Sequence, residues 1–262
     1  MLAQICQFFA VDSSNFPKNE LVFVGDKSSD GGFLIHYFIN LCQKQNRPLC
    51  FVGLSQSFNH YNSVAHKLGT NLLSARDENK NLIFIEGLKL ISECVSLHSG
   101  QFNESNPFLS LLKGNSTQFV NTIGASLANL AKIQSPNAPV VIVDDLSVLL
   151  RSGATPKDII LLVNSLNNII TLGPTKGSLI IFSSLDKDEE NELCAFLSHL
   201  CSVKIEITNL KSGYCKDVHG QIEVLWKDSL LNPREPKTTH SQFKLFDKSV
   251  ELFALGMSAA VL

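Results

Sequence analysis

Residues 21–33 read LVFVGDKSSDGGF, and the fold can be predicted outward from this stretch. An apolar run ends in Gly25, a short polar turn follows, and an apolar helical pattern begins at Phe33. A strand, a glycine-bounded turn and a helix in this order are the layout of a phosphate-binding loop. The stretch therefore predicts an α/β fold of the kind that holds nucleotides.

The turn lacks the residues that a phosphate site needs. Such a loop has a glycine, four residues and then Gly-Lys-Ser/Thr, so that the lysine reaches the phosphates and the hydroxyl holds Mg²⁺. Counting from Gly25 puts Asp30, Gly31 and Gly32 in those last three places. Counting back from Gly31 puts Gly32 and Phe33 in the lysine and hydroxyl places. Neither register works, so we predict a degenerate loop.

Charge in the same turn supports this interpretation. Asp26 and Asp30 bring negative charge to a helix N-terminus, where it opposes the binding of an anion. Lys27 lies between them, outside the lysine place of either register. We therefore predict no bound cofactor, no metal ion and no catalytic residue in the chain.

Further buried strands follow along the chain, separated by helical patterns. Continuous apolar runs, typical of parallel strands buried on both faces, occupy residues 49–52, 82–85, 140–145 and 178–182. Helical periodicity covers residues 31–45, 57–68, 119–133 and 158–172. Residues 98–118 are rich in glycine, serine and asparagine, which predicts a surface loop or insertion.

The C-terminal part, residues 201–262, changes to alternating polar and apolar residues. The alternation covers residues 203–207, 221–226, 242–246 and 250–253, and Asp247-Lys248 fits a hairpin turn. Alternation indicates strands with one wet face, as in antiparallel sheets. We therefore predict one domain over residues 1–262, with a mostly parallel sheet, an antiparallel C-terminal extension and helices on both faces.

Bulk composition narrows the functional classes. The 262 residues carry a formal net charge of -2, which gives no support to strong nucleic-acid or membrane binding. The N-terminus makes a poor signal peptide, and no apolar run approaches the roughly 20 residues of a membrane span. Seven cysteines without framework spacing indicate a reducing compartment. The sequence predicts a cytoplasmic protein, with the nucleus as a further location.

Two sets of polar residues are candidates for function. Asp144 ends an apolar strand, where an acid can help to hold Mg²⁺ in nucleotide sites; alternatively, Asp144 or Asp145 caps the helix that starts at Leu146. Basic residues near Tyr214 and Trp226 are candidates for RNA contact, although the acidic residues between them make a mixed solvated face the default interpretation. These basic residues are Lys204, Lys211, Lys216 and Lys227.

Several stretches resemble one family, the subunit 6 family of the Elongator complex, whose members are RecA-like proteins without a working phosphate-binding loop. The stretches are GGFLIHYF at 31–38, CFVGLSQSFNHY at 50–61, FIEGLK at 84–89, VDDLSVLL at 143–150, KDVHGQ at 216–221 and GMSAAVL at 256–262. They cover nearly the whole chain in order. RecA-like ATPases carry a water-activating glutamate after the second strand, and this chain has Ser55-Gln56 there.

The resemblance implies a non-catalytic subunit rather than an enzyme. Members of this family assemble with Elongator proteins 4 and 5 into a heterohexameric ring that holds two copies of each. That ring docks on the larger Elongator subunits and supports tRNA binding and modification of the wobble uridine (U34). The resemblance thus implies these subunits and tRNA as partners, and no membrane.

Two other interpretations remain open at this stage. One is a diverged RecA-like ATPase, in which Lys27 replaces the missing lysine and Asp144 holds Mg²⁺. The other is a small-molecule binding module that is unrelated to ring assembly and stable as a monomer. A ring subunit would instead behave poorly without its partners, because its apolar interfaces would be exposed.

Overall fold

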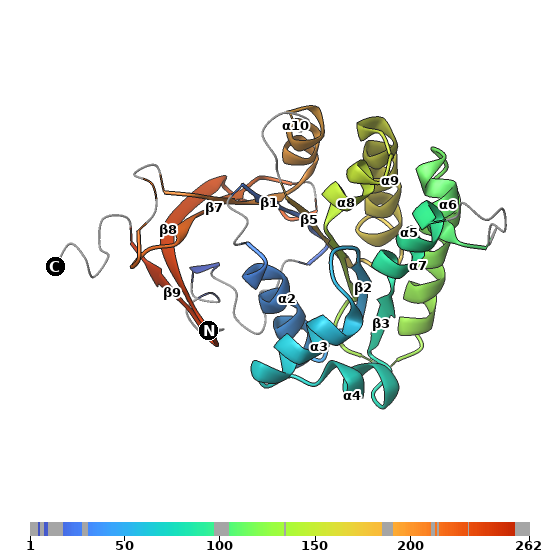
Figure 1. Cartoon of the computed structure of the whole chain (residues 1–262), viewed down its shortest axis with the longest axis horizontal. Helices are drawn as coiled ribbons and strands as arrows, with labels where there is room; N and C mark the ends of the chain where they lie inside the picture. The colour runs from blue at the N-terminus through green and yellow to red at the C-terminus, as the bar shows by residue number, and fades with distance from the viewer. Residues whose placement is uncertain are drawn as a thin grey trace.

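A nine-stranded sheet is the centre of the computed structural model (Figure 1). The structure describes residues 5, 8, 9, 18–27, 31–96, 105–133, 135–184, 191–210, 213, 215–229 and 231–254. The strands are β1 (Leu21–Asp26), β2 (Leu49–Gly53), β3 (Leu82–Ile85), β4 (Val140–Asp144), β5 (Ser178–Ser184), β6 (Val203–Thr208), β7 (Gly220–Trp226), β8 (Lys237–Phe246) and β9 (Ser249–Phe253). Their order across the sheet is β3-β2-β4-β5-β1-β6-β7-β8-β9.

Helices connect the parallel strands, as the sequence periodicity predicts. They are α2 (Phe33–Lys44), α3 (Phe58–Lys67), α4 (Leu72–Asp77), α5 (Gly87–Ser96), α6 (Pro107–Leu112), α7 (Thr117–Leu130), α8 (Leu146–Arg151), α9 (Pro156–Ile170) and α10 (Asn191–Leu200). The sequence analysis did not predict the short helix α4. It begins where the Asn71 side chain accepts a hydrogen bond from the Ser74 backbone N–H.

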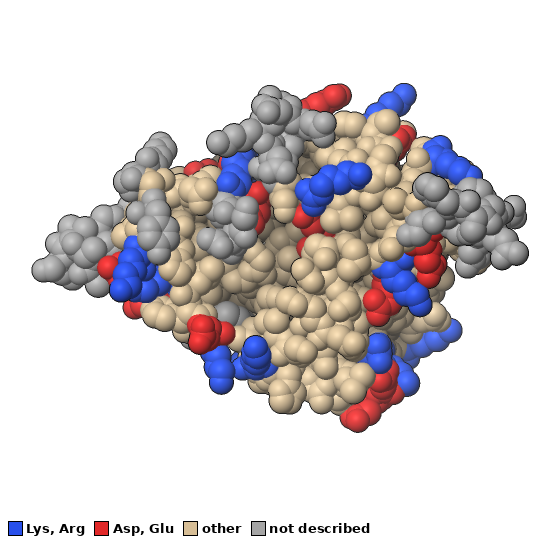
Figure 2. Space-filling view, in the orientation of Figure 1, with Lys and Arg blue, Asp and Glu red and all other residues tan. Residues whose placement is uncertain are grey.

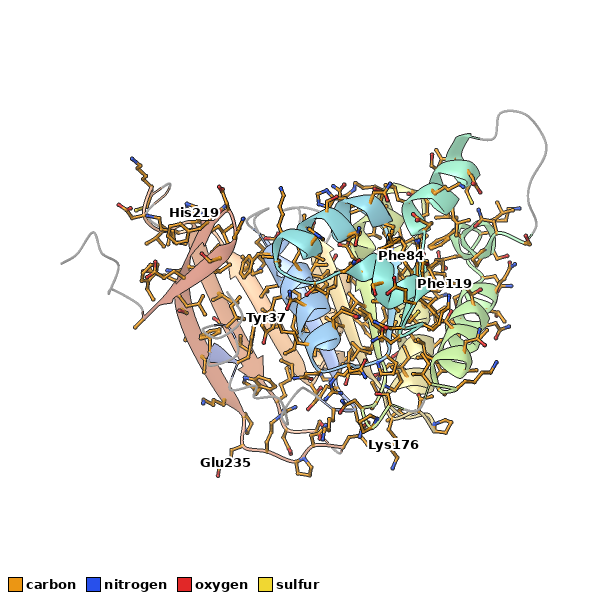
Figure 3. The ribbon with its side chains drawn as sticks, turned by 90° about the horizontal axis from the view of Figure 1, so that it is seen from below. Tyr37, Phe84, Phe119, Lys176, His219 and Glu235 are labelled. Carbon is orange, nitrogen blue, oxygen red and sulfur yellow. The ribbon has the colours of Figure 1, made fainter. Side chains whose placement is uncertain are left out.

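The sheet is covered by helices on both faces, which confirms the predicted layers. Leu34 and Tyr37 of α2 and Ala65 of α3 belong to one apolar core, together with Val22 and Val24 of β1. The helices α5 to α10 build a second core on the opposite face. Tyr37 belongs to the first core and Phe119 to the second, and both are labelled in Figure 3.

The antiparallel extension starts one strand later than predicted. We expected residues 203–207 to belong to it because polar and apolar residues alternate there. Instead β6 pairs in parallel with β1 and antiparallel with β7. The alternation reports correctly that one face of β6 is half-exposed, but it says nothing about strand direction. The strands β7, β8 and β9 follow as antiparallel neighbours, with the predicted hairpin turn at Asp247-Lys248.

The prediction of a surface loop over residues 98–118 is wrong for its second half. Helix α6 lies there, and Phe108 and Leu111 are fully buried in the second core. The Asn106 side chain accepts from the Phe108 backbone N–H, and Pro107 occupies the first helical turn, where its missing N–H costs nothing. Local composition suggested a loop because these apolar anchors are few.

The two ends of the chain are only partly described. The GMSAAVL stretch at residues 256–262 lies outside the described residues, and of the first ten residues the structure describes only Ile5, Phe8 and Phe9. Ile5 and Phe9 are buried, and the Phe9 ring lies 5.6 Å from that of Tyr37. No helix within the described ranges has the length and apolar character needed to cross a membrane.

Candidate functional site

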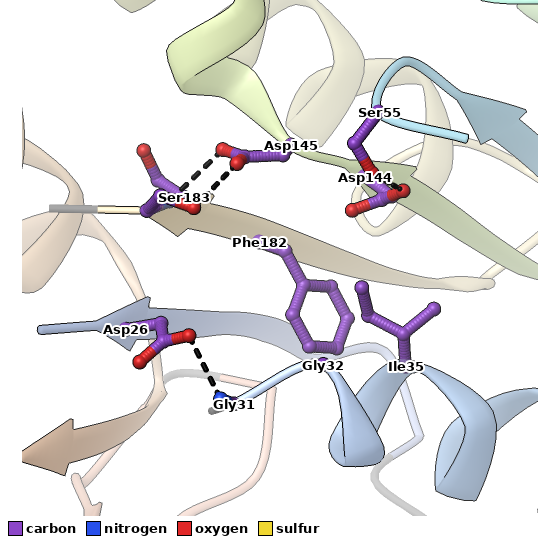
Figure 4. A pocket seen from close by; sticks show the side chains of 10 residues that line it. Asp26, Gly31, Gly32, Ile35, Ser55, Asp144, Asp145, Phe182 and Ser183 are labelled. Carbon is purple, nitrogen blue, oxygen red and sulfur yellow. Dashed lines mark hydrogen bonds between the residues drawn. The ribbon is translucent and has the colours of Figure 1, made fainter. Parts of the chain in front are cut away.

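A cavity of about 220 Å³ opens where the parallel strands β1, β4 and β5 end (Figure 4). The carboxyl ends of such strands are the usual ligand-binding edge of an open α/β sheet. The described residues that line it are Asp26, Gly31, Gly32, Ile35, Ser55, Asp144, Asp145, Phe182, Ser183 and Ser184. Three of them are acids, and no lysine, arginine or histidine is among them.

Asp144 is the most deeply buried of these acids, at 1% exposed. Its Oδ2 accepts a 2.6 Å hydrogen bond from the Ser55 hydroxyl, which follows β2. The Tyr61 hydroxyl, from α3, donates to the same oxygen. The Tyr61 ring is held in place by the Phe51 ring, 4.6 Å away. The candidate metal-binding acid of the sequence analysis is therefore already bonded to two neighbouring hydroxyl groups.

Burial is the largest cause of the pKa shifts of Asp144 and Tyr61. It raises the pKa of Asp144 to about 6, and the hydrogen bonds from Ser55 and Tyr61 counteract it only in part. The pKa of Tyr61 is raised as well, first by burial and then by the charge of Asp144. Desolvation therefore outweighs the two hydrogen bonds in setting the protonation of Asp144.

Asp145 caps helix α8, which confirms one of the two readings of the Asp-Asp pair. Its Oδ1 accepts from the backbone N–H of Ser147 at 3.0 Å and from that of Ser184 at 2.9 Å. Its Oδ2 accepts from the Ser184 hydroxyl at 2.6 Å, and an Arg151 guanidinium nitrogen lies 3.9 Å away. The peptide bond between Asp144 and Asp145 is cis. These contacts join the ends of β4 and β5.

A hydrogen bond joins Asp26, at the end of β1, to Gly31, just before α2. Asp26 Oδ2 accepts a 2.8 Å hydrogen bond from the backbone N–H of Gly31, one of the donors that a phosphate-binding loop would offer to its ligand. Gly25 lies inside β1, and Asp30 lies outside the described residues. Gly31 and Gly32 line the cavity directly before α2.

Lys27 is not among the residues that line this cavity. Its ammonium group forms an ion pair with Glu206 of β6, and Lys204 forms a second ion pair with the same carboxylate at 2.5 Å. The lysine on which the diverged-ATPase interpretation depends is thus held at the neighbouring strand. Between the acids, the Phe182 ring and the Ile35 side chain fill part of the space (Figure 4).

The arrangement suits a structural role better than phosphate binding. Three carboxylates without a lining cation repel an anion at close range. Within the described ranges, no group of three or more histidine, cysteine, aspartate or glutamate side chains is placed to hold a metal ion.

Among the described residues, the lysines predicted to contact RNA do not form one cluster, and two of them bind other groups of the protein. Lys204 pairs with Glu206, Lys227 donates to the Ser198 carbonyl, and Lys216 is exposed. Lys211 lies outside the described residues. On the face shown in Figure 2, basic and acidic residues are interspersed rather than gathered into one patch. RNA contact by these lysines stays a prediction.

Tyr61 is the site residue that the sequence analysis missed. It lies within a helical pattern, where a buried aromatic residue is ordinary, and 83 positions separate it from Asp144. No spacing rule connects two residues so far apart, although Ser55 and Tyr61 both lie in the CFVGLSQSFNHY stretch.

The fold defines the protein class. The structure is similar to that of a KaiC-like protein from Pyrococcus horikoshii, with a TM-score of 0.59 and 13% identity over 92% of both chains. It also resembles an uncharacterized protein from the same organism, solved in complex with an unknown peptide, with a TM-score of 0.64 and 9% identity over 96% of both chains. The chain therefore has a RecA/KaiC-like α/β fold.

Sequence comparison identifies the family. A family model described as elongation complex protein 6 matches residues 3–247. Elongator complex protein 6 of Xenopus laevis is 34% identical over 100% of both chains, and that of Homo sapiens is 34% identical over 94% of both. That of Dictyostelium discoideum is 25% identical over 92% of both. The chain belongs to the Elongator complex protein 6 family.

Proposed function

We propose that this chain is a non-catalytic subunit of the Elongator complex, located in the cytoplasm and also in the nucleus. In this proposal it forms a heterohexameric RecA-like ring with Elongator proteins 4 and 5. The ring binds the larger Elongator subunits and tRNA, and so supports modification of the wobble uridine (U34). The chain itself holds no nucleotide.

The observation that carries the proposal is that the Asp144 carboxylate is already hydrogen-bonded within the protein. Its Oδ2 accepts from both Ser55 and Tyr61, so this oxygen is already bonded inside the protein. Lys27 pairs with Glu206 and does not line the cavity. Both residues of the diverged-ATPase alternative are thus already bonded to other protein groups, Asp144 within the cavity and Lys27 at β6, which favours the subunit interpretation.

A RecA-like fold without nucleotide chemistry still has a use in a ring. Fold and function are separable, and sites are added to or lost from a shared scaffold. Ring assembly depends on the surfaces that each subunit presents to its neighbours. Family membership supplies the expectation of Elongator partners, and these surfaces would explain why the fold persists without a nucleotide.

Calorimetry of the purified chain with MgATP tests the inactive site. We expect no saturable heat, and no change in the Lys27→Ala and Asp144→Ala variants, because neither residue is available to the nucleotide. Micromolar binding that both substitutions abolish would contradict the proposal and favour the diverged ATPase.

Assembly is tested by co-expression with Elongator proteins 4 and 5. Native mass spectrometry should show a hexamer with two copies of each chain, as the family resemblance implies. Crosslinking of the assembled ring to tRNA should then label this subunit. A stable, fully soluble monomer that does not join the other two proteins would instead favour an independent binding module.

A further inference from the structure

The antiparallel end of the sheet has a strand edge that is only half covered. Strand β8 runs from Lys237 to Phe246, but β9 pairs only with residues 242–246 of it. The Ser241 hydroxyl donates to the Phe253 carbonyl at 2.6 Å, which marks the end of the covered half. Residues 237–240 pair with β7 on one side. On their other side, the described part of the chain provides no strand.

The open half of β8 presents main-chain groups in a regular row. The Phe243 carbonyl accepts from the His219 N–H on the β7 side of the strand. Because successive residues of a strand direct their N–H and C=O groups to opposite edges, Gln242 faces β9. By the same alternation, Thr238 and His240 direct theirs to the open edge. An exposed row of this kind is a template for one more strand.

A groove of about 460 Å³ lies on the sheet face beside this edge. Glu206, Glu223 and His240 line it and occupy neighbouring positions on β6, β7 and β8. Glu206 already binds Lys27 and Lys204. Glu223 is 47% exposed in its side chain, and its ionic partner is His240, whose Nδ1 lies 3.3 Å away. Glu223 is therefore the acid that remains accessible from the open edge.

We propose that the open half of β8 accepts an extended segment of a partner protein as an added strand, with a lysine or arginine opposite His240. Such binding combines main-chain hydrogen bonds, which supply affinity, with pockets for alternate side chains, which supply specificity. The proposal goes beyond the ring function, since strand addition needs neither nucleotide nor tRNA.

The geometry determines which side chains the added strand should carry. A residue opposite His240 lies two strand spacings, about 10 Å, from Glu223. The combined lengths of an arginine and a glutamate side chain span that gap. Two residues further along, the added strand meets Thr238, whose neighbour on β7 is Leu225. A β-branched apolar residue fits there. The expected pattern is basic, any residue, then valine or isoleucine.

Charge argues that the occupant comes from another protein. Residues 255–262, which follow β9, read LGMSAAVL and contain no basic residue to meet Glu223. A second copy of this chain that added β9 would bring another acid, Glu251, to the edge beside Glu223. A basic segment of a partner is complementary to Glu223, whereas these two occupants are not.

The probe is a fluorescein-labelled peptide, Thr-Val-Arg-Thr-Val-Thr, titrated with the full chain and followed by fluorescence anisotropy. We expect saturable binding, about tenfold weaker for a peptide with glutamate in place of arginine. Glu223→Gln should weaken binding of the arginine peptide by about tenfold and should reduce the difference in affinity between the arginine and glutamate peptides. The Glu251→Gln variant, changed outside the groove, is the matched control and should bind the arginine peptide like the unaltered chain.

Main-chain pairing is tested separately. Thr238→Pro removes an N–H that faces the open edge but leaves the β7 pairing intact, so it should abolish binding while circular dichroism stays unchanged. If this variant does not fold, a probe that is N-methylated on the amides facing β8 tests the same bonds on the unaltered chain. The probe methylated on the amides that face β8 should not bind, whereas a probe methylated on the amides that face away from β8 should bind.

Several results would overturn the proposal. One is a titration in which the arginine peptide shows no saturable binding. Another is equal affinity for the arginine and glutamate peptides, and a third is binding that persists when either set of peptide amides is N-methylated. Slow amide exchange at Thr238 and His240 in the free monomer would assign the edge to the chain's own residues 255–262. A dimer in sedimentation that Thr238→Pro dissociates would assign it to a second copy.

Discussion

Replacing Asp144 by asparagine should change how the stability of the protein depends on pH. Burial raises the pKa of Asp144 from its ordinary value of 3.8 to about 6. Between these two values the folded protein binds more protons than the unfolded chain, so the free energy of unfolding falls as pH rises. Each pKa unit corresponds to about 1.4 kcal/mol, which makes the loss about 3 kcal/mol above about pH 7.

Asparagine at this position does not titrate, and its amide oxygen can still accept from Ser55 and Tyr61. The free energy of unfolding of the variant minus that of the unaltered protein should therefore increase by about 2.4 kcal/mol between about pH 4 and pH 7, because part of the effect already lies below pH 4. The difference is the quantity to measure, because burial beside His60 lowers the pKa of His36 to about 4. That shift makes the unaltered protein gain stability with rising pH over an overlapping range.

The assay is urea denaturation, followed by circular dichroism at several pH values for both proteins. A surface control is Asp77→Asn. A hydrogen bond from Arg76 keeps the pKa of Asp77 below its ordinary value of 3.8. The free energy of unfolding of Asp77→Asn minus that of the unaltered protein should therefore stay constant above about pH 5. An Asp144→Asn difference that stays constant over the same range, or that decreases, would refute the assignment of Asp144 as a desolvated carboxyl group.

Three further substitutions, one of them with a control, test the packing and ion pairing that hold the fold together. Phe108→Ala should lower the free energy of unfolding by about 3–5 kcal/mol in chemical denaturation, because the ring is fully buried; a loss below about 1 kcal/mol would mean that α6 is not anchored in the core. Gly53→Ala would place its Cβ 2.5 Å from a phenylalanine ring and should cost about 1–3 kcal/mol. Gly32→Ala, with nothing within 4 Å, should change the melting temperature little and serves as its control. Arg234→Met leaves Glu20, which is 2% exposed, without its ionic partner. It should cost about 3–5 kcal/mol at pH 7 and less at pH 5, where Glu20, whose pKa burial raises, can take up a proton; equal losses at both pH values would contradict this.

The parallel strands were predictable because their signal is local. A strand buried on both faces needs a continuous apolar run, and VVIV before Asp144 is such a run. The cap at Asp145 was predictable for a similar reason, since an N-cap bonds to a residue two or three positions along the chain. Where a structural role depends on neighbours in sequence, the residues themselves carry the information.

The misjudged elements depend on distant contacts. Helix α6 is held by Phe108, whose ring lies 5.0 Å from that of Phe119, a residue of the next helix. The alternation in β6 reports one half-exposed face, but its parallel neighbour β1 lies about 180 residues earlier in the chain. Neither contact leaves a periodic pattern in its own segment.

The same division applies to the candidate site. By itself, the sequence determined that the LVFVGDKSSDGGF turn has no lysine and hydroxyl at the places where phosphate binding needs them, because that chemistry depends on fixed spacing. Only the tertiary structure decided what the remaining acid does. Folding brings Tyr61 of α3 and Ser55 to Asp144, and it holds Lys27 at Glu206. The physical reason is that a buried carboxylate must be hydrogen-bonded, and its partners come from whichever segments the sheet order places beside it.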